Sequence, residues 1–376
     1  MTAAEKLLCE IIALPSVNPA FLPDNNLRAG EQSVADFLAA IAAQAGLDVA
    51  FQAVLPGRTN LIATLRPTGK VRQRVLLAPH LDTVPGTSDE QYVPVMQDQR
   101  IYGRGACDTK GSVAAMLSAL CQVARSGSRP LQTEIVFAGL ADEENAQAGS
   151  RALADCGLKA GLAIVGEPTQ LKIVTAHKGS LWLALQTHGK AAHGARPDLG
   201  RNAVHEMARV VCLLETDYAA SLRQKRHPVL GRATVNVGAI SGGTQPNIVP
   251  DHCRASVDRR TLPGETKKSV HAELQKLFRA HRLRVQIADQ KKVPCLPMQT
   301  DPHLPLVRQF FGVAGQKKPA GVDYFCDASV LSRAGIPSVI FGPGDIAQAH
   351  TSDEWIARNS LANATALLEK FFRSLP

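Results

Sequence analysis

Short apolar segments alternate with longer amphipathic ones through the first half of the chain, and few folds accommodate that pattern. The apolar segments span residues 60–67, 74–80, 133–140 and 161–168, and the amphipathic ones span 31–46, 110–127 and 150–157. Apolar runs of strand length that alternate with helices are typical of a mostly parallel sheet flanked by helices. The sequence therefore predicts an α/β domain.

The pattern changes at about residue 176. Segments 179–190, 233–240, 252–260 and 283–288 favour strands, and segments 202–217 and 265–281 favour helices. This β-α-β-β-α-β order predicts a ferredoxin-like α+β domain. The α/β style returns in residues 326–344 and in a closing helix over 360–375. We expect residues 1–175 and 289–376 to form one α/β domain, interrupted by an inserted α+β domain over 176–288.

Composition excludes several classes of protein. The net charge is +9, but the basic residues are scattered and aromatic residues make up only 5% of the chain, so we expect no nucleic-acid partner. No apolar run reaches transmembrane length, and residues 1–14 favour an amphipathic helix rather than a signal peptide, so we expect no membrane partner. Eight cysteines without a C-x-x-C pair predict reduced thiols and a cytoplasmic protein.

Acidic and histidine side chains follow successive strands of the predicted α/β domain. The carboxyl ends of parallel strands meet at one edge of a sheet, which is where such folds bind ligands. Taken alone, each residue has an ordinary explanation, such as a helix cap, a solvated helix start, a turn or a structural histidine. Their joint placement favours a single site, formed by His80, Asp82, Asp108, Glu143, Glu144, Glu167 and His350.

Several carboxylates in one crevice repel each other unless cations compensate them. Imidazole and carboxylate ligands suit zinc, and a carboxylate shared by two ions is typical of a two-metal hydrolytic site. If Glu144 binds metal, its neighbour Glu143 stays free as a general base. Asp82 could accept the second N–H of His80, because histidines that bind metal need such a partner.

The segments "PHLDTVP", "GRGACDTKG", "ADEE", "GEPT" and "FGPGDIAQAH" resemble the signature segments of the dizinc amidohydrolases and metallopeptidases. This family includes acetylornithine deacetylase, succinyl-diaminopimelate desuccinylase, aminoacylase and the glutamate carboxypeptidases. The resemblance implies a zinc-exopeptidase-like catalytic domain with two Zn2+, for which Co2+ or Mn2+ could substitute. It implies that Asp108 bridges the ions, that His80 and Glu167 complete one site, and that Glu144 and His350 complete the other. It also implies a cis peptide bond between Asp108 and Thr109.

In the family, the inserted domain is a lid and a dimerisation domain. The resemblance of "GKAAHGARPDLG" implies that His193 stabilises the oxyanion in the partner's active site of a homodimer. Asn247 and Arg260 fall where relatives contact the substrate, and a guanidinium suits a free carboxylate. Arg259 is the competing candidate. Strand alternation sends the two arginines to opposite faces, so only one of them can point inward.

We therefore expect hydrolysis of the amide bond of N-acyl amino acids by a water between the zinc ions, with Glu143 as the base. The segments "GEPTQLKIVTAHKG" and "FGPGDIAQAH" are most similar to the acetylornithine deacetylase-like members. A desuccinylase, aminoacylase, dipeptidase or carboxypeptidase could use the same core, and a non-catalytic dimeric binding protein is a more distant alternative. Thr109 and Cys326 depart from the usual methionine and threonine, which bears on the substrate more than on the chemistry.

Overall fold

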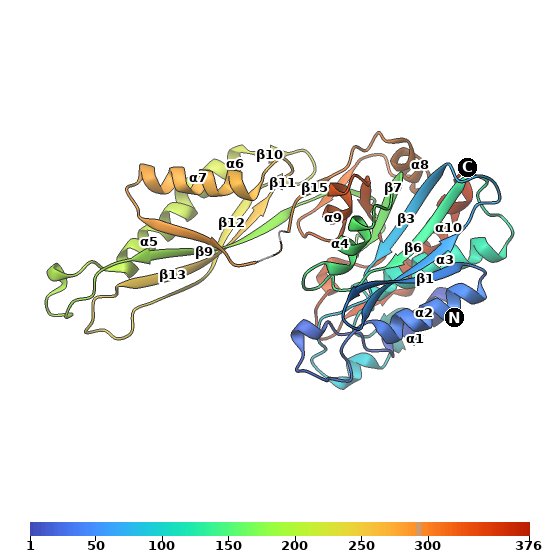
Figure 1. Ribbon diagram of the computed structural model, residues 1–376, viewed down its shortest axis with the longest axis horizontal. Helices are drawn as coiled ribbons and strands as arrows, with labels where there is room; N and C mark the ends of the chain where they lie inside the picture. Colours follow the sequence, from blue (N-terminus) through green and yellow to red (C-terminus); the bar gives the residue numbers. More distant parts are fainter. Residues whose placement is uncertain (292, 294) are drawn as a thin grey trace. The chain divides into compact units, whose positions relative to one another are not determined.

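The computed structural model describes residues 1–291, 293 and 295–376 (Figure 1). Its chain forms two compact units. The first, here called the α/β unit, comprises Met1–Thr175, Gln299–Ala320 and Cys326–Pro376. The second, here called the inserted unit, comprises Ala176–Met298 and Gly321–Phe325. The chain thus re-enters the α/β unit ten residues later than the sequence pattern suggested, and it makes a second short excursion at 321–325.

The α/β unit is built on one large sheet. Its strands run in the order β1-β2-β6-β3-β7-β17-β8-β15, with β16 paired to β8. The central strands β6, β3, β7 and β17 are parallel, which confirms the predicted mostly parallel sheet, and the antiparallel pairs β1–β2, β2–β6 and β8–β17 flank them. The strands are β1 (Asp48–Leu55), β2 (Arg58–Leu65), β3 (Gln73–Pro79), β6 (Thr133–Gly139), β7 (Leu162–Gly166), β8 (Val174–His177), β15 (Met298–Gln299), β16 (Ala320–Val322) and β17 (Ser338–Ile340).

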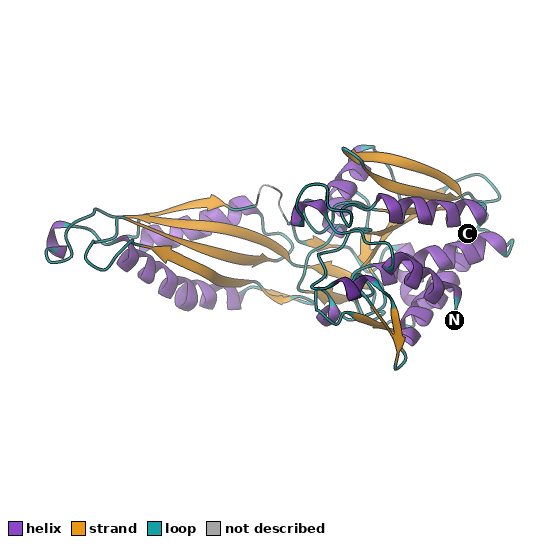
Figure 2. Ribbon diagram, turned by 90° about the horizontal axis from the view of Figure 1, so that it is seen from below, coloured by secondary structure: helices purple, strands orange, loops and turns teal. Residues whose placement is uncertain are grey.

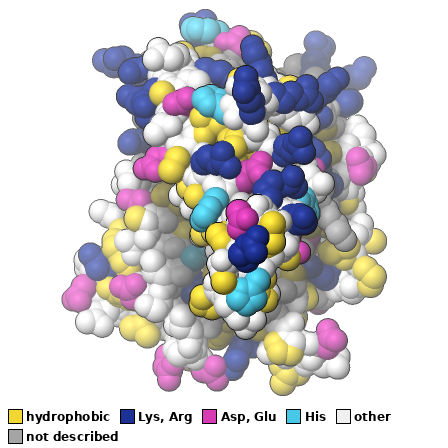
Figure 3. Space-filling model, turned by 90° about the vertical axis from the view of Figure 1, so that its left-hand side faces the viewer, with side chains coloured by type: hydrophobic (Ala, Val, Ile, Leu, Met, Phe, Trp, Pro, Cys, Tyr) yellow, Lys and Arg dark blue, Asp and Glu magenta, His cyan; other side chains and the backbone are white. Residues whose placement is uncertain are grey.

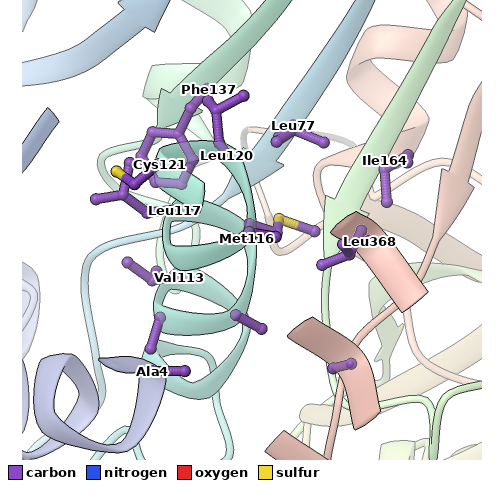
Figure 4. Close-up of a cluster of buried hydrophobic side chains, with 14 of the residues drawn as sticks. Ala4, Leu77, Val113, Met116, Leu117, Leu120, Cys121, Phe137, Ile164 and Leu368 are labelled. Atoms are coloured by element: carbon purple, nitrogen blue, oxygen red, sulfur yellow. The ribbon is translucent and has the colours of Figure 1, made fainter. Parts of the chain in front are cut away.

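Seven α-helices accompany this sheet in the described residues, and α3 lies at the centre of the core. Figure 4 shows Val113, Met116 and Leu120 of α3 beside Leu77 of β3 and Phe137 of β6. Helices α1 and α10 pack against α3. The start of α3, two residues after Asp108, is therefore firmly fixed. The helices are α1 (Ala3–Ile12), α2 (Gln32–Gln44), α3 (Lys110–Arg125), α4 (Ala148–Asp155), α8 (Pro305–Ala314), α9 (Ala328–Arg333) and α10 (Arg358–Ser374).

A small antiparallel sheet joins two distant segments of the α/β unit. Its strands are β4 (Val95–Gln97), β5 (Arg100–Tyr102) and β18 (Trp355–Ala357), in the order β18-β5-β4. Strand β5 leads into the loop that carries Asp108, and β18 follows the loop that carries His350. This pairing connects the two loops through their backbones.

The inserted unit has the predicted β-α-β-β-α-β order. Its sheet is antiparallel throughout, in the order β12-β13-β9-β14, and Figure 2 shows its helices on one face of the strands. The predicted helix 202–217 ends at Leu213 and continues as a π-helical turn over Leu214–Tyr218. The elements are β9 (Gly179–His188), α5 (Ala203–Leu213), α6 (Ala219–Gln224), β10 (Arg226–His227), β11 (Gly231–Arg232), β12 (Thr234–Gly242), β13 (His252–Thr261), α7 (Lys267–Ala280) and β14 (Val285–Asp289).

The positive charge of the chain is concentrated in the inserted unit. Between residues 176 and 298, Lys and Arg outnumber Asp and Glu about two to one, whereas the rest of the chain is close to balance. Figure 3 shows Lys and Arg side chains scattered over one face of the molecule, interrupted by acidic and histidine side chains. Among the described residues, no helix is both long enough and apolar enough to span a membrane.

Candidate active site

The parallel strands of the α/β unit end on the residues that the sequence singled out. Strands β6, β3, β7 and β17 are neighbours, so their carboxyl ends lie along one edge of the sheet. Asp108 reaches the same place from the start of α3. The side chains gathered at this edge are His80 after β3, Glu143 and Glu144 after β6, Glu167 after β7, and His350 in the loop beyond β17.

The carboxylate of Asp108 lies between two histidines. Its Oδ1 is 3.1 Å from His80 Nε2, and its Oδ2 is 3.3 Å from His350 Nε2. Burial alone would raise the pKa of Asp108, but its hydrogen bonds to His350 and His80 outweigh burial and hold that pKa well below its usual range. The two oxygens of one ionised carboxylate therefore face two different imidazoles.

Each histidine also has a glutamate beside it. Glu167 Oε1 lies 4.0 Å from His80 Nε2, and Glu144 Oε1 lies 3.2 Å from His350 Nε2. Burial raises the pKa of both glutamates, because it disfavours their charged forms. The hydrogen bonds of His350 to Asp108 and Glu144 raise its pKa to about 10. A positive charge between these carboxylates is therefore strongly favoured.

Asp82 holds the backbone of neighbouring site residues through hydrogen bonds. It is fully buried, and its carboxylate accepts hydrogen bonds from Glu143 N (3.0 Å) and Glu144 N (3.1 Å). Asn18 Nδ2, which the sequence did not single out, donates a third at 2.7 Å. His80 Nδ1 lies 2.9 Å from the main-chain oxygen of Asp82 and 3.4 Å from its Oδ1. The predicted pairing of His80 with Asp82 thus runs mainly through the carbonyl, which leaves His80 Nε2 facing Asp108.

Glu143 lies in an environment that favours the protonated form of its carboxyl group. Burial raises its pKa well above the ordinary value, and the nearby charges of Glu167 and Asp327 act in the same direction. Asp327 is buried, accepts a hydrogen bond from Ser150 Oγ at 2.5 Å, and has its pKa raised to about 6 by burial. No role was predicted for Asp327, because an aspartate at a helix start usually acts as a cap.

The bond between Asp108 and Thr109 is a cis peptide bond, as the family resemblance implied. Thr109, which stands where methionine is common, donates from Oγ1 to the carbonyl of Gly166 at 2.8 Å. Its hydroxyl therefore connects the start of α3 to the end of β7, one residue before Glu167.

The donor set at this edge suits a divalent metal. Among the described residues, ligand atoms of His80, Asp108 and Glu144 lie within 4.8 Å of one another, and they are the only group of three or more His, Cys, Asp or Glu residues that meets this spacing. The ligand atoms are imidazole nitrogen and carboxylate oxygen, which is the chemistry of catalytic zinc sites. Buried carboxylates with raised pKa values are the groups that a cation would stabilise.

The remaining predicted site residues lie in the inserted unit. His193 is exposed, and its Nδ1 accepts a hydrogen bond from Ala195 N at 3.1 Å. The neighbouring Gly194 N donates to Asn247 O at 2.7 Å, so the His193 and Asn247 segments are adjacent. Arg260 lies apart from them on β13, with its side chain 31% exposed and its Nε donating to Asp258 at 2.9 Å.

The two adjacent arginines of β13 do point to opposite faces of the sheet. Arg259 is fully buried, where its Nε donates to Tyr218 Oη at 3.0 Å and its Nη2 lies 2.5 Å from Glu265 Oε1. Arg260 keeps part of its guanidinium accessible. Of the two, Arg260 alone is available to a ligand from solvent.

Comparisons with known proteins agree with this architecture. Residues 76–374 match the model of peptidase family M20/M25/M40. An acetylornithine deacetylase from Myxococcus xanthus is 32% identical over 326 residues, which cover 83% of this chain and 83% of the relative. The protein therefore belongs to peptidase family M20/M25/M40 and is a metal-dependent hydrolase that acts on amides or peptides.

Solved structures share the whole fold at low sequence identity. Aminopeptidase PepT from Bacillus cereus has a TM-score of 0.77 at 21% identity, covering 99% of this chain and 97% of that one. The YXEP protein of Bacillus subtilis, described as a dinuclear metal-binding peptidase, has a TM-score of 0.70 at 13% identity, covering 98% and 96%. These likenesses concern the fold.

Proposed function

We propose that the protein hydrolyses the amide bond of N-acyl amino acids, with N-acetylornithine as its substrate, at a centre that holds two zinc ions. Family membership and the acetylornithine deacetylase relative at 32% identity support the reaction class and the substrate. Co2+ or Mn2+ would also suit the ligands.

The observation that carries the two-ion centre is the position of Asp108. Each of its oxygens faces a different histidine, at 3.1 and 3.3 Å, which supports a carboxylate that would be shared by two cations. His80 and Glu167 would complete the ligands of one ion, and Glu144 and His350 those of the other. The YXEP relative is described as dinuclear, which agrees with this assignment.

The ions, when bound, would supply Lewis acidity and lower the pKa of water. Glu143 takes the proton from the attacking water and delivers it to the leaving amine. Its burial, which raises its pKa, suits a carboxyl group that must hold a proton near neutral pH. Asp82 holds His80 and the backbone of Glu143 in place.

We assign supporting roles to three residues of the inserted unit. His193 donates a hydrogen bond to the oxyanion in the partner subunit of a homodimer. Its Nδ1 accepts from Ala195 N, so in the neutral ring Nε2 carries the hydrogen and is the donor. Arg260 binds the substrate carboxylate through its accessible guanidinium, and Asn247 contacts the substrate beside His193.

We place the enzyme in the cytoplasm. Cys107, Cys121, Cys253 and Cys326 are buried thiols, which is common in a reducing compartment. The substrates proposed are small molecules of amino-acid metabolism.

Primary-amine release from a matched panel tests the substrate. Zinc-loaded protein is assayed with N-acetylornithine, N-succinyl-diaminopimelate, N-acetylmethionine and several dipeptides. We expect the highest kcat/KM with N-acetylornithine. A higher value with a dipeptide or with another acyl group would overturn the substrate assignment and leave the centre intact. No turnover with the whole panel, with both metals bound, would contradict the substrate class.

A further inference from the structure

A buried glutamate outside the proposed ligand set connects the two loops that carry Asp108 and His350. Glu354 lies four residues after His350 and is 2% exposed. Its Oε1 accepts hydrogen bonds from Cys107 N (2.8 Å) and Asp108 N (2.9 Å). Its Oε2 accepts from Gly105 N (3.0 Å) and from Arg104 Nη1 (2.7 Å). Both carboxylate oxygens are thus committed to the Asp108 loop.

Arg104, which belongs to the loop of Asp108, in turn binds the loop of His350. It is 1% exposed, and its Nη2 donates to the carbonyl of Thr351, the residue directly after His350, at 3.1 Å. Gln91 Nε2 donates to the carbonyls of Thr351 (3.2 Å) and Ser352 (2.8 Å). The Arg104–Glu354 pair therefore fixes the backbone on both sides of the Asp108–His350 contact.

The two proposed metal sites depend on this pair to different extents. His80 and Glu167 follow the central parallel strands β3 and β7, whose pairing fixes them independently of the Arg104–Glu354 pair. His350 is not held by strand pairing. It lies in a loop, its φ is 63°, and its side chain is 51% exposed. Its distance from Asp108 is set by the loops that Arg104 and Glu354 join.

We propose that Glu354, with Arg104, is a positioning residue that holds His350 against Asp108 and thereby enables the ion of Asp108, Glu144 and His350 to bind. The inference rests on the two-ion centre proposed above. Replacing Glu354 removes a carboxylate that accepts four hydrogen bonds. In Glu354→Gln, the amide NH2 replaces one acceptor oxygen and faces backbone N–H groups or Arg104, so the loops must separate.

The experiment measures metal binding by the full-length protein, independently of turnover. Metal-free protein is titrated with Co2+, and calorimetry and the visible d–d absorption report the number of ions and the affinity of each. His350→Ala, which lacks a proposed ligand, identifies the spectrum and the affinity of the ion at Asp108, Glu144 and His350. Glu134→Gln is the matched control, since Glu134 is also buried and paired with an arginine, Arg74, but lies at the start of β6, about 20 Å along the strand from the centre.

We expect Glu354→Gln to weaken the His350-dependent ion by about 10- to 100-fold and the other ion, which shares Asp108, by clearly less. Glu354→Asp, which keeps the charge on a shorter side chain, should recover part of that affinity, and it also serves if Glu354→Gln does not fold. Glu134→Gln should bind both ions as the wild type does. Wild-type affinity for both ions in Glu354→Gln, or an equal loss of both, would overturn the proposal.

A wild-type protein that binds a single ion would contradict the two-ion centre itself. The affinity for that one ion then tests the role of Glu354. Weaker binding in Glu354→Gln than in Glu134→Gln would support positioning of Asp108 and His350. Equal binding in the two variants would overturn it.

Discussion

In the α/β unit most candidate residues are buried at the ends of neighbouring parallel strands, with only the side chain of His350 half exposed, whereas in the inserted unit they lie on an exposed loop and a partly exposed sheet face. His80, Asp108 and Glu167 are each less than a tenth exposed, and His80 Nε2 lies 3.1 Å from Asp108 and 4.0 Å from Glu167. His193 is exposed, and the side chain of Arg260 is 31% exposed. The buried candidate residues already face one another within one unit, whereas the exposed ones can act only on a ligand or another subunit that reaches them.

The largest effect is expected in the buried centre. Glu143→Gln keeps the shape of the side chain and removes its ability to accept a proton, so kcat should fall about 10²- to 10⁴-fold with metal content unchanged. Steady-state kinetics with metal analysis provides the measurement. A variant that binds metal normally and turns over at the wild-type rate would exclude Glu143 as the base.

His193→Ala should lower kcat about 10²- to 10³-fold, because one donor to the oxyanion is lost. Mixing this variant with Glu143→Gln distinguishes action in cis from action in trans. If His193 serves the partner subunit, a mixed dimer has one intact site, and random exchange at equal amounts should restore about one quarter of wild-type activity. If the mixture stays as inactive as its components after exchange, His193 does not act across subunits.

Substitution of the two adjacent arginines of β13 should affect different properties, stability for Arg259 and substrate binding for Arg260. Arg259→Met removes the buried guanidinium that binds Tyr218 Oη and Glu265, and Glu265 keeps Lys225 and Leu262 N as partners, so the free energy of unfolding should fall by about 1–3 kcal/mol. Arg260→Met should leave stability close to that of the wild type and raise KM about 10- to 100-fold, because a charge-assisted contact with the substrate is lost. Thermal unfolding and Michaelis kinetics of both variants check this. A KM effect confined to Arg259 would reverse the assignment.

The smallest effect concerns pH and the fold of the inserted unit. Burial lowers the pKa of His177 to about 4. Below about pH 6.5 the imidazole of His177 is therefore protonated in the unfolded chain but stays neutral in the native state. The free energy of unfolding consequently falls as the pH falls from 6.5 towards 4. His177 should contribute a loss of about 2 kcal/mol between pH 7.5 and 5.0, so the wild type should lose about 2 kcal/mol more over this range than His177→Gln. Urea unfolding followed by Trp182 fluorescence, in a Trp355→Phe background, reports it. An equal loss in the glutamine variant would assign it to other groups.

The convergence of the metal-site residues was predictable because strand ends in a parallel sheet share one edge. His80, Glu144 and Glu167 each follow a recognisable apolar run, so topology alone brings them together. Asn18, Asp327 and Glu354 were not predicted, since each acts through hydrogen bonds to residues far away in the sequence. Glu354 lies in the segment "HTSDEW", where an acidic residue near a strand resembles any solvated turn.

Edge elements were also hard to predict from sequence. Strand β1 is largely apolar but has no fully buried residue, and all three residues of β4 are exposed, so packing against a core does not shape either sequence. The inserted unit was easier, because its strands alternate in burial. The core residues of β13, Cys253, Ala255 and Val257, occupy every second position.

The way the chain enters and leaves the inserted unit affects how the protein can fold. Strand β8, which ends in the inserted unit, and strand β15, where the chain returns, are neighbours in the large sheet, and Thr300 N donates to Thr175 O at 2.8 Å. Strand β17 and helix α10 must therefore find β7 and α3 across more than 120 intervening residues. If the inserted unit folds early during synthesis, it brings the two ends of this long segment together. The remaining strands then join the sheet by closing a short loop, which costs less entropy than closing a long one.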